Sequence, residues 1–113
     1  MFKSNQLFKG SLTTIVLSLL EQNEKMYGYE ITQKVKELTN ADLKITEGAL
    51  YPALHKLEGD GLLTVTLEKV GNRNRKYYQL TENGKTENVN KLADLKDFIE
   101  QMQLILNTKL ATQ

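Results

Sequence analysis

Cysteine is absent from this sequence. Its absence excludes disulfide bonds, cysteine-ligated zinc and a thiol nucleophile, and it fits the reducing cytoplasm, where we expect this chain to work. Long apolar runs are also missing. The longest, Ile15 to Leu20, is interrupted by Ser18 and is far too short to cross a bilayer. The N-terminus has no secretory signal, so we expect no membrane partner.

Groups that carry catalysis are equally scarce. The only histidine is His55, which has no serine near it in sequence, and a lone histidine on a polar helix face is usually a surface residue. Together with Glu47 or Glu58 it offers too few ligands for a metal site. Residues 59–61 lack the flanking pattern of a phosphate-binding loop. We therefore predict that the chain is not an enzyme and holds neither metal nor cofactor.

The residues that are present predict a single folded domain. The chain has 113 residues, of which 40% are hydrophobic and 26% are charged. Its net charge of +1 does not by itself indicate a nucleic-acid partner, so the distribution of charge matters more. Between residues 69 and 78 there is no acid, and four cations occur: Lys69, Arg73, Arg75 and Lys76.

The stretch from Thr46 to Leu63 predicts a helix that reads DNA. Thr46 can cap this helix, and Gly59 and Gly61 can end it. Leucines at positions 50, 54 and 57 form an apolar face at helical spacing. The opposite stripe is small, aromatic and basic: Gly48, Tyr51, Pro52, His55 and Lys56. Pro52 breaks a local rule inside a helix, as functional sites often do. The alternative is an amphipathic core helix with a tolerated kink.

Two shorter helices precede this one. The first runs from about residue 11 to 21, with an apolar face made by Leu12, Ile15, Val16, Leu19 and Leu20. The second runs from about residue 27 to 38, with Ile31, Val35 and Leu38 toward the core. Lys34 lies off that face, where a helix crossing a DNA backbone could use it. A short polar linker, 39–45, then completes a helix-turn-helix pattern.

A two-stranded hairpin follows. Apolar residues at 63, 65 and 67 alternate with polar ones, which predicts a half-buried strand. Gly71 and Asn72 supply turn chemistry, and residues 76–80 form the returning strand, with Tyr78 and Leu80 on one face.

The hairpin tip carries a basic loop, composed of Asn72, Arg73, Asn74, Arg75 and Lys76. Residues two apart on an extended strand point the same way, so both arginines can face one DNA backbone, whose phosphates suit arginine forks. A charged hairpin tip is often only a solvated turn. Its position directly after a helix-turn-helix favours DNA contact.

Thr81 can cap a last helix, from about residue 82 to 110. Its apolar residues repeat at 3, 4, 3, 4 spacing, which is typical of a coiled-coil seam: Leu92, Leu95, Ile99, Met102 and Leu106. Phe98 adds a second apolar edge. So small a domain cannot cover this face by itself, and we therefore predict a homodimer.

Three segments resemble the PadR family of bacterial transcriptional regulators: MYGYEI at 26–31, EGALYPALHKLEGDGLL at 47–63 and NRKYYQLTENGK at 74–85. The single long C-terminal helix is similar to the short branch of that family. The resemblance implies a two-fold dimer and repression of nearby promoters, relieved by small molecules. Drug-binding members hold planar aromatic ligands between their subunits with tryptophans of the last helix. This chain has no tryptophan. Any effector would meet Leu12, Ile15, Leu95 and Phe98.

We thus expect a mainly α protein with a two-stranded β-hairpin wing. Residues 1–81 form a winged helix-turn-helix, and residues 82–113 a C-terminal dimerisation helix. We predict a homodimeric repressor of a detoxification or efflux gene that binds a palindromic double-stranded operator and responds to a small apolar or aromatic effector. The alternative is a winged-helix adaptor that binds a protein.

Overall fold

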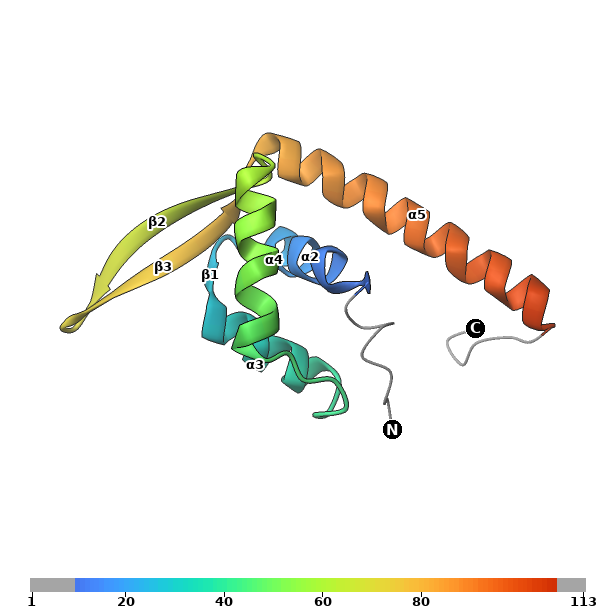
Figure 1. The fold of residues 1–113 in the computed structure, drawn as a ribbon, viewed down its shortest axis with the longest axis horizontal. Coiled ribbons are helices and arrows are strands. Elements are labelled where there is room, and N and C mark those ends of the chain that lie inside the picture. Colours follow the sequence, from blue (N-terminus) through green and yellow to red (C-terminus); the bar gives the residue numbers. More distant parts are fainter. Residues whose placement is uncertain (1–9, 108–113) are drawn as a thin grey trace.

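A computed structural model describes residues 10–107 (Figure 1). Within that range, helices and strands follow in the order α2 (Leu12–Gln22), β1 (Met26–Tyr27), α3 (Gly28–Leu38), α4 (Glu47–Gly59), β2 (Leu63–Val70), β3 (Arg73–Leu80) and α5 (Glu82–Leu106). The wing, defined here as the β2–β3 hairpin, projects from one end of the molecule, and α5 projects from the other. The last predicted residues of α5, 108–110, lie outside the described range.

The core forms where α2, α3 and α4 meet the base of the sheet. Helix α2 lies at its centre and buries Leu12, Val16, Leu17, Leu19 and Leu20. The three leucines predicted for the apolar face of α4 are buried too, as are Ile31 and Ile45. Leu38 is an exception, because it ends α3 beyond the core and is 63% exposed. The helical periodicity therefore located the core but not its limits.

Helix α3 begins at Gly28 because the two residues before it join the sheet. Met26 pairs with Tyr78, and Tyr27 pairs with Tyr77. The Glu30 carboxylate accepts a hydrogen bond from the Tyr27 backbone N–H at 3.0 Å, which satisfies a donor at the start of the helix. The sheet therefore has three strands, in the order β1-β3-β2, rather than the two that the sequence predicted.

Helix α4 has the cap that the sequence predicted. The Thr46 hydroxyl accepts a hydrogen bond from the backbone N–H of Ala49 at 3.2 Å. Beyond the helix, Gly61 adopts a φ of +78°, the left-handed conformation that glycine tolerates. Gly59 is instead the last helical residue. Pro52 lies within the helix and is exposed. Since proline has no N–H, the Gly48 carbonyl receives no helical hydrogen bond from it.

The wing is a long antiparallel hairpin with a two-residue turn. Leu63 lies opposite Leu80 at its base, and Val70 lies opposite Arg73 at its tip. Gly71 has a φ of +62°, as the first central residue of a tight hairpin turn requires. Tyr78 and Leu80, predicted to share one face of the returning strand, are both buried. Leu67, predicted to lie on the buried face of a half-buried strand, is 66% exposed because the wing extends past the helices that cover its base.

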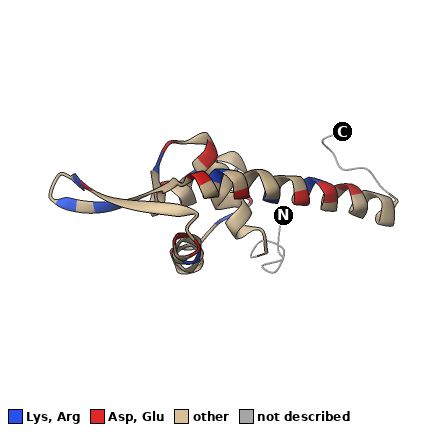
Figure 2. Ribbon diagram, turned by 90° about the horizontal axis from the view of Figure 1, so that it is seen from above, with Lys and Arg blue, Asp and Glu red and all other residues tan. Residues whose placement is uncertain are grey.

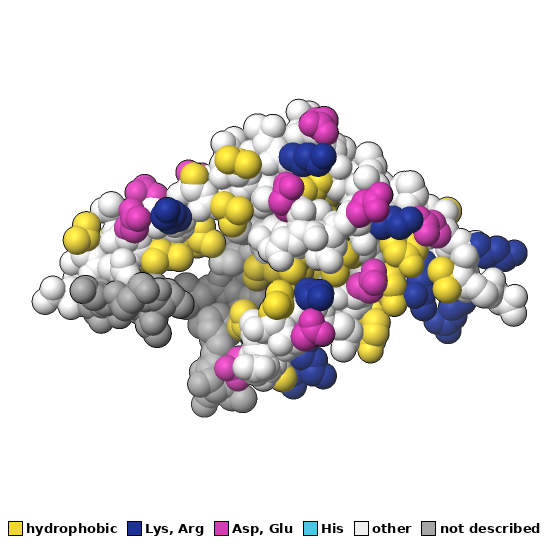
Figure 3. All heavy atoms as spheres, turned by 180° about the vertical axis from the view of Figure 1, so that it is seen from behind, with side chains coloured by type: hydrophobic (Ala, Val, Ile, Leu, Met, Phe, Trp, Pro, Cys, Tyr) yellow, Lys and Arg dark blue, Asp and Glu magenta, His cyan; other side chains and the backbone are white. Residues whose placement is uncertain are grey.

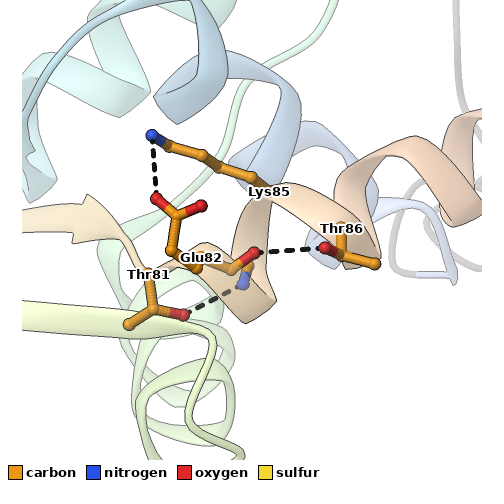
Figure 4. A network of polar contacts seen from close by, with 5 residues as sticks. Thr81, Glu82, Lys85 and Thr86 are labelled. Carbon is orange, nitrogen blue, oxygen red and sulfur yellow. Dashed lines mark hydrogen bonds and ion pairs between the residues drawn. The ribbon is translucent and has the colours of Figure 1, made fainter.

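Helix α5 is anchored at its first turns. The Thr81 hydroxyl accepts a hydrogen bond from the Gly84 N–H at 2.9 Å and donates one to the Gly61 carbonyl at 2.7 Å. Figure 4 shows the hydrogen bond that the Thr81 hydroxyl accepts and, beside it, the Lys85–Glu82 ion pair. Among the described residues of α5, only Gly84 and Asn88 are buried. The rest of the helix crosses α2 and extends away from the core (Figure 1).

The predicted fold class is confirmed: the protein is mainly helical, with a β wing that follows a helix-turn-helix and a long terminal helix. No helix in residues 10–107 is both long and apolar enough to cross a membrane.

Candidate nucleic-acid interface

A cleft of about 590 Å³ lies between the wing and the first turns of α3 and α4. It brings together residues that the sequence predicted for DNA binding on two separate elements: Tyr51 from α4, and Arg73, Asn74, Arg75 and Lys76 from β3. Tyr27, Gly28, Tyr29, Glu47 and Tyr78 complete its lining. Three cations and one carboxylate, that of Glu47, therefore line this cleft among the residues that the structure describes.

The sequence predicted that Tyr51 points away from the core, but the structure shows that it does not. Its side chain is half-buried and packs against the core. A methyl group added to Gly28 would come within 2.6 Å of the Tyr51 hydroxyl, so the tyrosine fills the space that the glycine leaves. A helical wheel of α4 alone cannot show this contact, because α3 supplies it. Tyr51 thus supports the interface and also forms part of its surface.

The other predicted residues of α4 are on the surface. Gly48, Pro52, His55 and Lys56 are all exposed. His55 and Lys56 lie more than one turn beyond Tyr51, outside the cleft, and the Lys56 ammonium is 3.0 Å from the Asp60 carboxylate. Pairs of this kind between exposed side chains are weak, so a phosphate could replace Asp60.

The wing presents its cations in two ways. Arg73, Asn74 and Lys76 are exposed, as is Asn72 in the turn. Figure 2 shows Lys and Arg gathered at the far end of the wing. Arg75 is partly buried instead, because its guanidinium lies over the Tyr27 ring, 4.2 Å from the ring centre. Arg73 and Arg75 occupy alternate positions of β3, so they share one face of the strand as predicted.

Beside Arg75 lies a group of residues that the sequence did not indicate. The Lys25 ammonium forms an ion pair with the Glu68 carboxylate and lies 5.2 Å from the centre of the Tyr77 ring. The rings of Tyr27 and Tyr77 meet edge to face, with their centres 5.4 Å apart. No acid occurs between residues 69 and 78, but Glu68 directly precedes this stretch and lies opposite Arg75 on β2. Only the strand register shows which cation this acid faces.

The remaining predicted contact, Lys34 of α3, lies outside the cleft. Its ammonium is 3.2 Å from the Glu37 carboxylate, and its side chain is partly exposed. No group of three or more histidine or carboxylate side chains that could hold a metal ion occurs in residues 10–107.

A second hollow, of about 260 Å³ and mostly apolar, lies between α2, α3 and α5. Two of the four residues predicted for an effector pocket, Ile15 and Leu95, line it. Phe98 is 56% exposed and borders a neighbouring, more polar hollow with Leu95. Leu12 lines neither hollow, because it is buried in the core. Leu12 therefore lies apart from both hollows, and its part in an effector pocket stays a prediction.

The predicted seam on α5 is uncovered in the single chain. Leu95, Ile99 and Met102 are partly exposed, whereas Leu92 and Leu106 are 41% and 60% exposed. Figure 3 shows hydrophobic side chains along this arm of the molecule. An exposed apolar face of this kind commonly marks a surface that another protein covers.

Comparisons with known proteins agree with this geometry. Residues 16–89 match the model of the "Transcriptional regulator PadR-like family". An uncharacterised protein from Lysinibacillus sphaericus is 32% identical over 100 residues, which cover 85% of this chain and 91% of that protein.

Two solved structures show the same fold. A transcriptional regulator from Clostridium thermocellum has a TM-score of 0.79 at 28% identity, over 94% of this chain and 96% of its own. PadR from Bacillus subtilis, solved in complex with operator DNA, has a TM-score of 0.65 at 32% identity, over 72% of this chain and 46% of that protein. The shared part therefore spans less than half of the Bacillus protein.

Proposed function

This chain belongs to the PadR-like family of transcriptional regulators, and we propose that it is a homodimeric repressor that binds operator DNA through α4 and the wing. The predicted resemblance is confirmed by the family match, and the prediction that the chain is not an enzyme agrees with it.

One observation carries the proposal: the first half of α4 and the basic strand of the wing line the same cleft. A helix in the major groove and a neighbouring cationic hairpin can engage one DNA duplex at the same time. The related Bacillus protein in complex with operator DNA supports the same use of this fold.

Each predicted residue then has a role. Residues at the start of the recognition helix approach base edges, so Thr46, Gly48, Tyr51 and Pro52 face the major groove. Lys34, His55 and Lys56 lie at the sides of the helix-turn-helix, where phosphates pass. Asn72, Arg73, Asn74, Arg75 and Lys76 follow the backbone beside the groove. Arg73 is the exposed arginine of that set and therefore the strongest candidate for a phosphate contact.

Two copies joined along α5 would place two such surfaces on one duplex. The seam of Leu92, Leu95, Ile99, Met102 and Leu106, with Phe98 beside it, supplies the apolar contact. Two-fold symmetry predicts a palindromic operator with half-sites about 10 base pairs apart or a multiple of that. Promoter binding takes place where the chromosome is, in the cytoplasm. Residues 1–81 thus serve as the DNA-binding part and residues 82–113 as the dimerisation helix.

The effector follows from the apolar hollow beside Ile15 and Leu95. A small apolar or aromatic molecule bound there would contact α2 and α5 together. Its binding could thereby change the angle between the DNA-binding part and the seam on α5. Because tryptophan is absent, aliphatic contacts replace ring stacking. A detoxification or efflux gene is the target that such an effector would suit.

The test is selection of bound duplexes from a random DNA library, followed by a salt series on the selected duplex. We expect a palindromic motif, with log affinity falling against log salt by about 0.9 for each phosphate neutralised. Enrichment of no motif, with no binding at about 50 mM salt, would contradict the proposal. That result would favour the adaptor alternative, in which α5 binds a protein.

A further inference from the structure

Glu68 and Arg75 are opposite charges at opposing positions of the wing, yet no ion pair joins them. Their Cα atoms are register partners on β2 and β3. Directly opposed residues on one face of an antiparallel pair lie close enough for their side chains to interact. Within the described residues, however, Glu68 pairs with Lys25, which approaches from the segment before β1. The carboxylate is therefore already occupied by a different cation.

Arg75 lies on an aromatic surface instead. Its guanidinium stacks over Tyr27, 4.2 Å from the ring centre. The Tyr27 ring in turn contacts the Tyr77 ring edge to face. The Lys25 ammonium lies over the Tyr77 ring. The stacking leaves the edge of the guanidinium, which carries its N–H donors, free to bind another acceptor, and Arg75 lines the cleft beside α4.

We propose that Lys25 is a positioning residue for DNA binding: by occupying Glu68, it keeps Arg75 on Tyr27 and available to a phosphate. The inference rests on the proposed function. Without Lys25, the Glu68 carboxylate has one cation directly opposite it, Arg75. An arginine paired with a carboxylate offers its N–H donors to that carboxylate rather than to a phosphate.

Charge supports the same arrangement. The hydrogen bond and the charge of Glu68 raise the pKa of Lys25 against a smaller opposing effect of desolvation, so its ammonium stays protonated at any physiological pH. A carboxylate on a DNA-facing surface repels phosphates unless a cation neutralises it. Lys25 neutralises Glu68 from the base of the wing and so leaves the arginine at the cleft unpaired.

The test compares Lys25→Met, Glu68→Gln and the double variant on a mixed-sequence duplex of about 30 base pairs, long enough for two half-sites. We expect Lys25→Met to weaken binding at 0.1 M salt by about five- to tenfold per subunit and to lower the salt slope by about one unit per subunit. In the double variant, both the affinity and the salt slope should return to the wild-type values. Lys85→Met, which removes the same charge from an ion pair on α5, should leave the slope unchanged.

Measurements in a second variant distinguish an effect of Lys25 on the position of Arg75 from a direct contact between Lys25 and DNA. If Lys25 acts through Arg75, then Lys25→Met should change nothing further in a chain that carries both Arg75→Ala and Glu68→Gln, because neither the arginine nor the unneutralised carboxylate is then present. A full additional loss there, or a double variant that keeps the low slope, would show that Lys25 binds a phosphate itself and would overturn the inference.

The position of the Arg75 side chain can be measured by NMR in the absence of DNA. Stacking over Tyr27 should shift the side-chain NMR signals of Arg75 upfield through the ring current. Lys25→Met should abolish this shift, and adding Glu68→Gln should restore it. An unchanged shift in Lys25→Met contradicts the inference even if the wild type binds DNA. Absence of any salt-dependent DNA binding by the wild type contradicts the proposed function instead.

Discussion

The hydroxyl of Tyr51 lies against Gly28, so close that a Cβ on the glycine would come within 2.6 Å of it. Tyr51 comes from α4, the proposed recognition helix, and Gly28 begins α3. A residue without a side chain is therefore needed where these two helices meet. The contact fixes the separation of the helices at the end of α4 that borders the cleft.

Gly28→Ala should consequently destabilise the protein by about 1–3 kcal/mol, the usual cost of overpacking. Because the nearest atoms belong to the far end of the Tyr51 ring, the ring should move rather than the backbone, and duplex binding should weaken as well. Thermal unfolding and fluorescence anisotropy measure the two effects. Gly48→Ala is the matched control for the stability measurement alone, since nothing lies within 4 Å of its added methyl group, whereas Gly48 itself belongs to the proposed DNA-facing surface. A Gly28→Ala chain as stable as Gly48→Ala would mean that the two helices are not held by this contact.

Gly84 should tolerate substitution less well than Gly28. Its added Cβ would lie 2.1 Å from the Leu62 carbonyl oxygen, a backbone atom fixed by its hydrogen bond from the Thr81 N–H. Gly84→Ala should therefore shift the first turn of α5 and cost about 3 kcal/mol or more, at the upper end of overpacking effects. Urea unfolding of Gly84→Ala beside Gly59→Ala, which meets open space, checks this. Equal midpoints for the two variants would contradict it.

Periodicity predicted the helices, the hairpin and the core because burial on one face leaves a repeating pattern in the sequence. Strand β1 escaped prediction because its two residues are too few to show a period. The sequence likewise placed Arg73 and Arg75 on one strand face, but not the stacking of Arg75 on Tyr27. That contact joins segments 48 positions apart, and no local pattern encodes it. Contacts between elements, such as Gly28 with Tyr51, are visible only in the folded chain.

Alkaline pH should destabilise the protein through Tyr78. Burial raises the pKa of its phenol, and the charges of Tyr51 and Glu58 act in the same direction. The unfolded chain then loses this proton at about pH 10, before the folded chain does. Since the folded state binds more protons there, the free energy of unfolding falls as pH rises above about 10.

Tyr78→Phe should show a shallower loss of stability over the same alkaline range. The Lys25–Glu68 pair adds a loss of the same sign, because the raised Lys25 pKa stabilises only the protonated folded chain. Both variants, Tyr78→Phe and Glu68→Gln, should therefore be followed by thermal melts from about pH 8 to pH 11, which spans both ordinary pKa values. Identical alkaline slopes for wild type and Tyr78→Phe would exclude Tyr78 as the cause.

The α5 seam should control the oligomeric state. Replacing Leu95 and Ile99 with glutamate places charges where two apolar helices would meet, and an unpaired buried charge is costly. Sedimentation velocity should then show monomers that keep the helical circular dichroism of the wild type. Gln101→Glu, on an exposed position of the same helix, is the matched control. A dimer that survives the double substitution would place the interface elsewhere.

Arg73 should contribute to DNA binding without contributing to stability. It is exposed near the wing tip, opposite Val70, and lines the cleft on the same strand face as Arg75. Arg73→Ala should therefore change the free energy of unfolding by less than about 0.5 kcal/mol. It should weaken binding to selected operator and to random duplex together, because a phosphate contact carries no sequence information.

The Lys69→Ala variant distinguishes a phosphate contact by Arg73 from an effect of the total charge of the wing. Lys69 lies on β2 opposite Asn74, so its side chain is on the other face of the wing from Arg73, and it does not line the cleft. Arg73→Ala should lower the salt slope by about one unit per subunit, whereas Lys69→Ala should lower it by much less. If one arginine enters a narrow minor groove, its loss should be greatest on operators with A·T-rich flanks. Equal slopes for the two variants would mean that the wing acts only through its total charge, and an unchanged wild-type affinity in both would mean that it is a solvated turn.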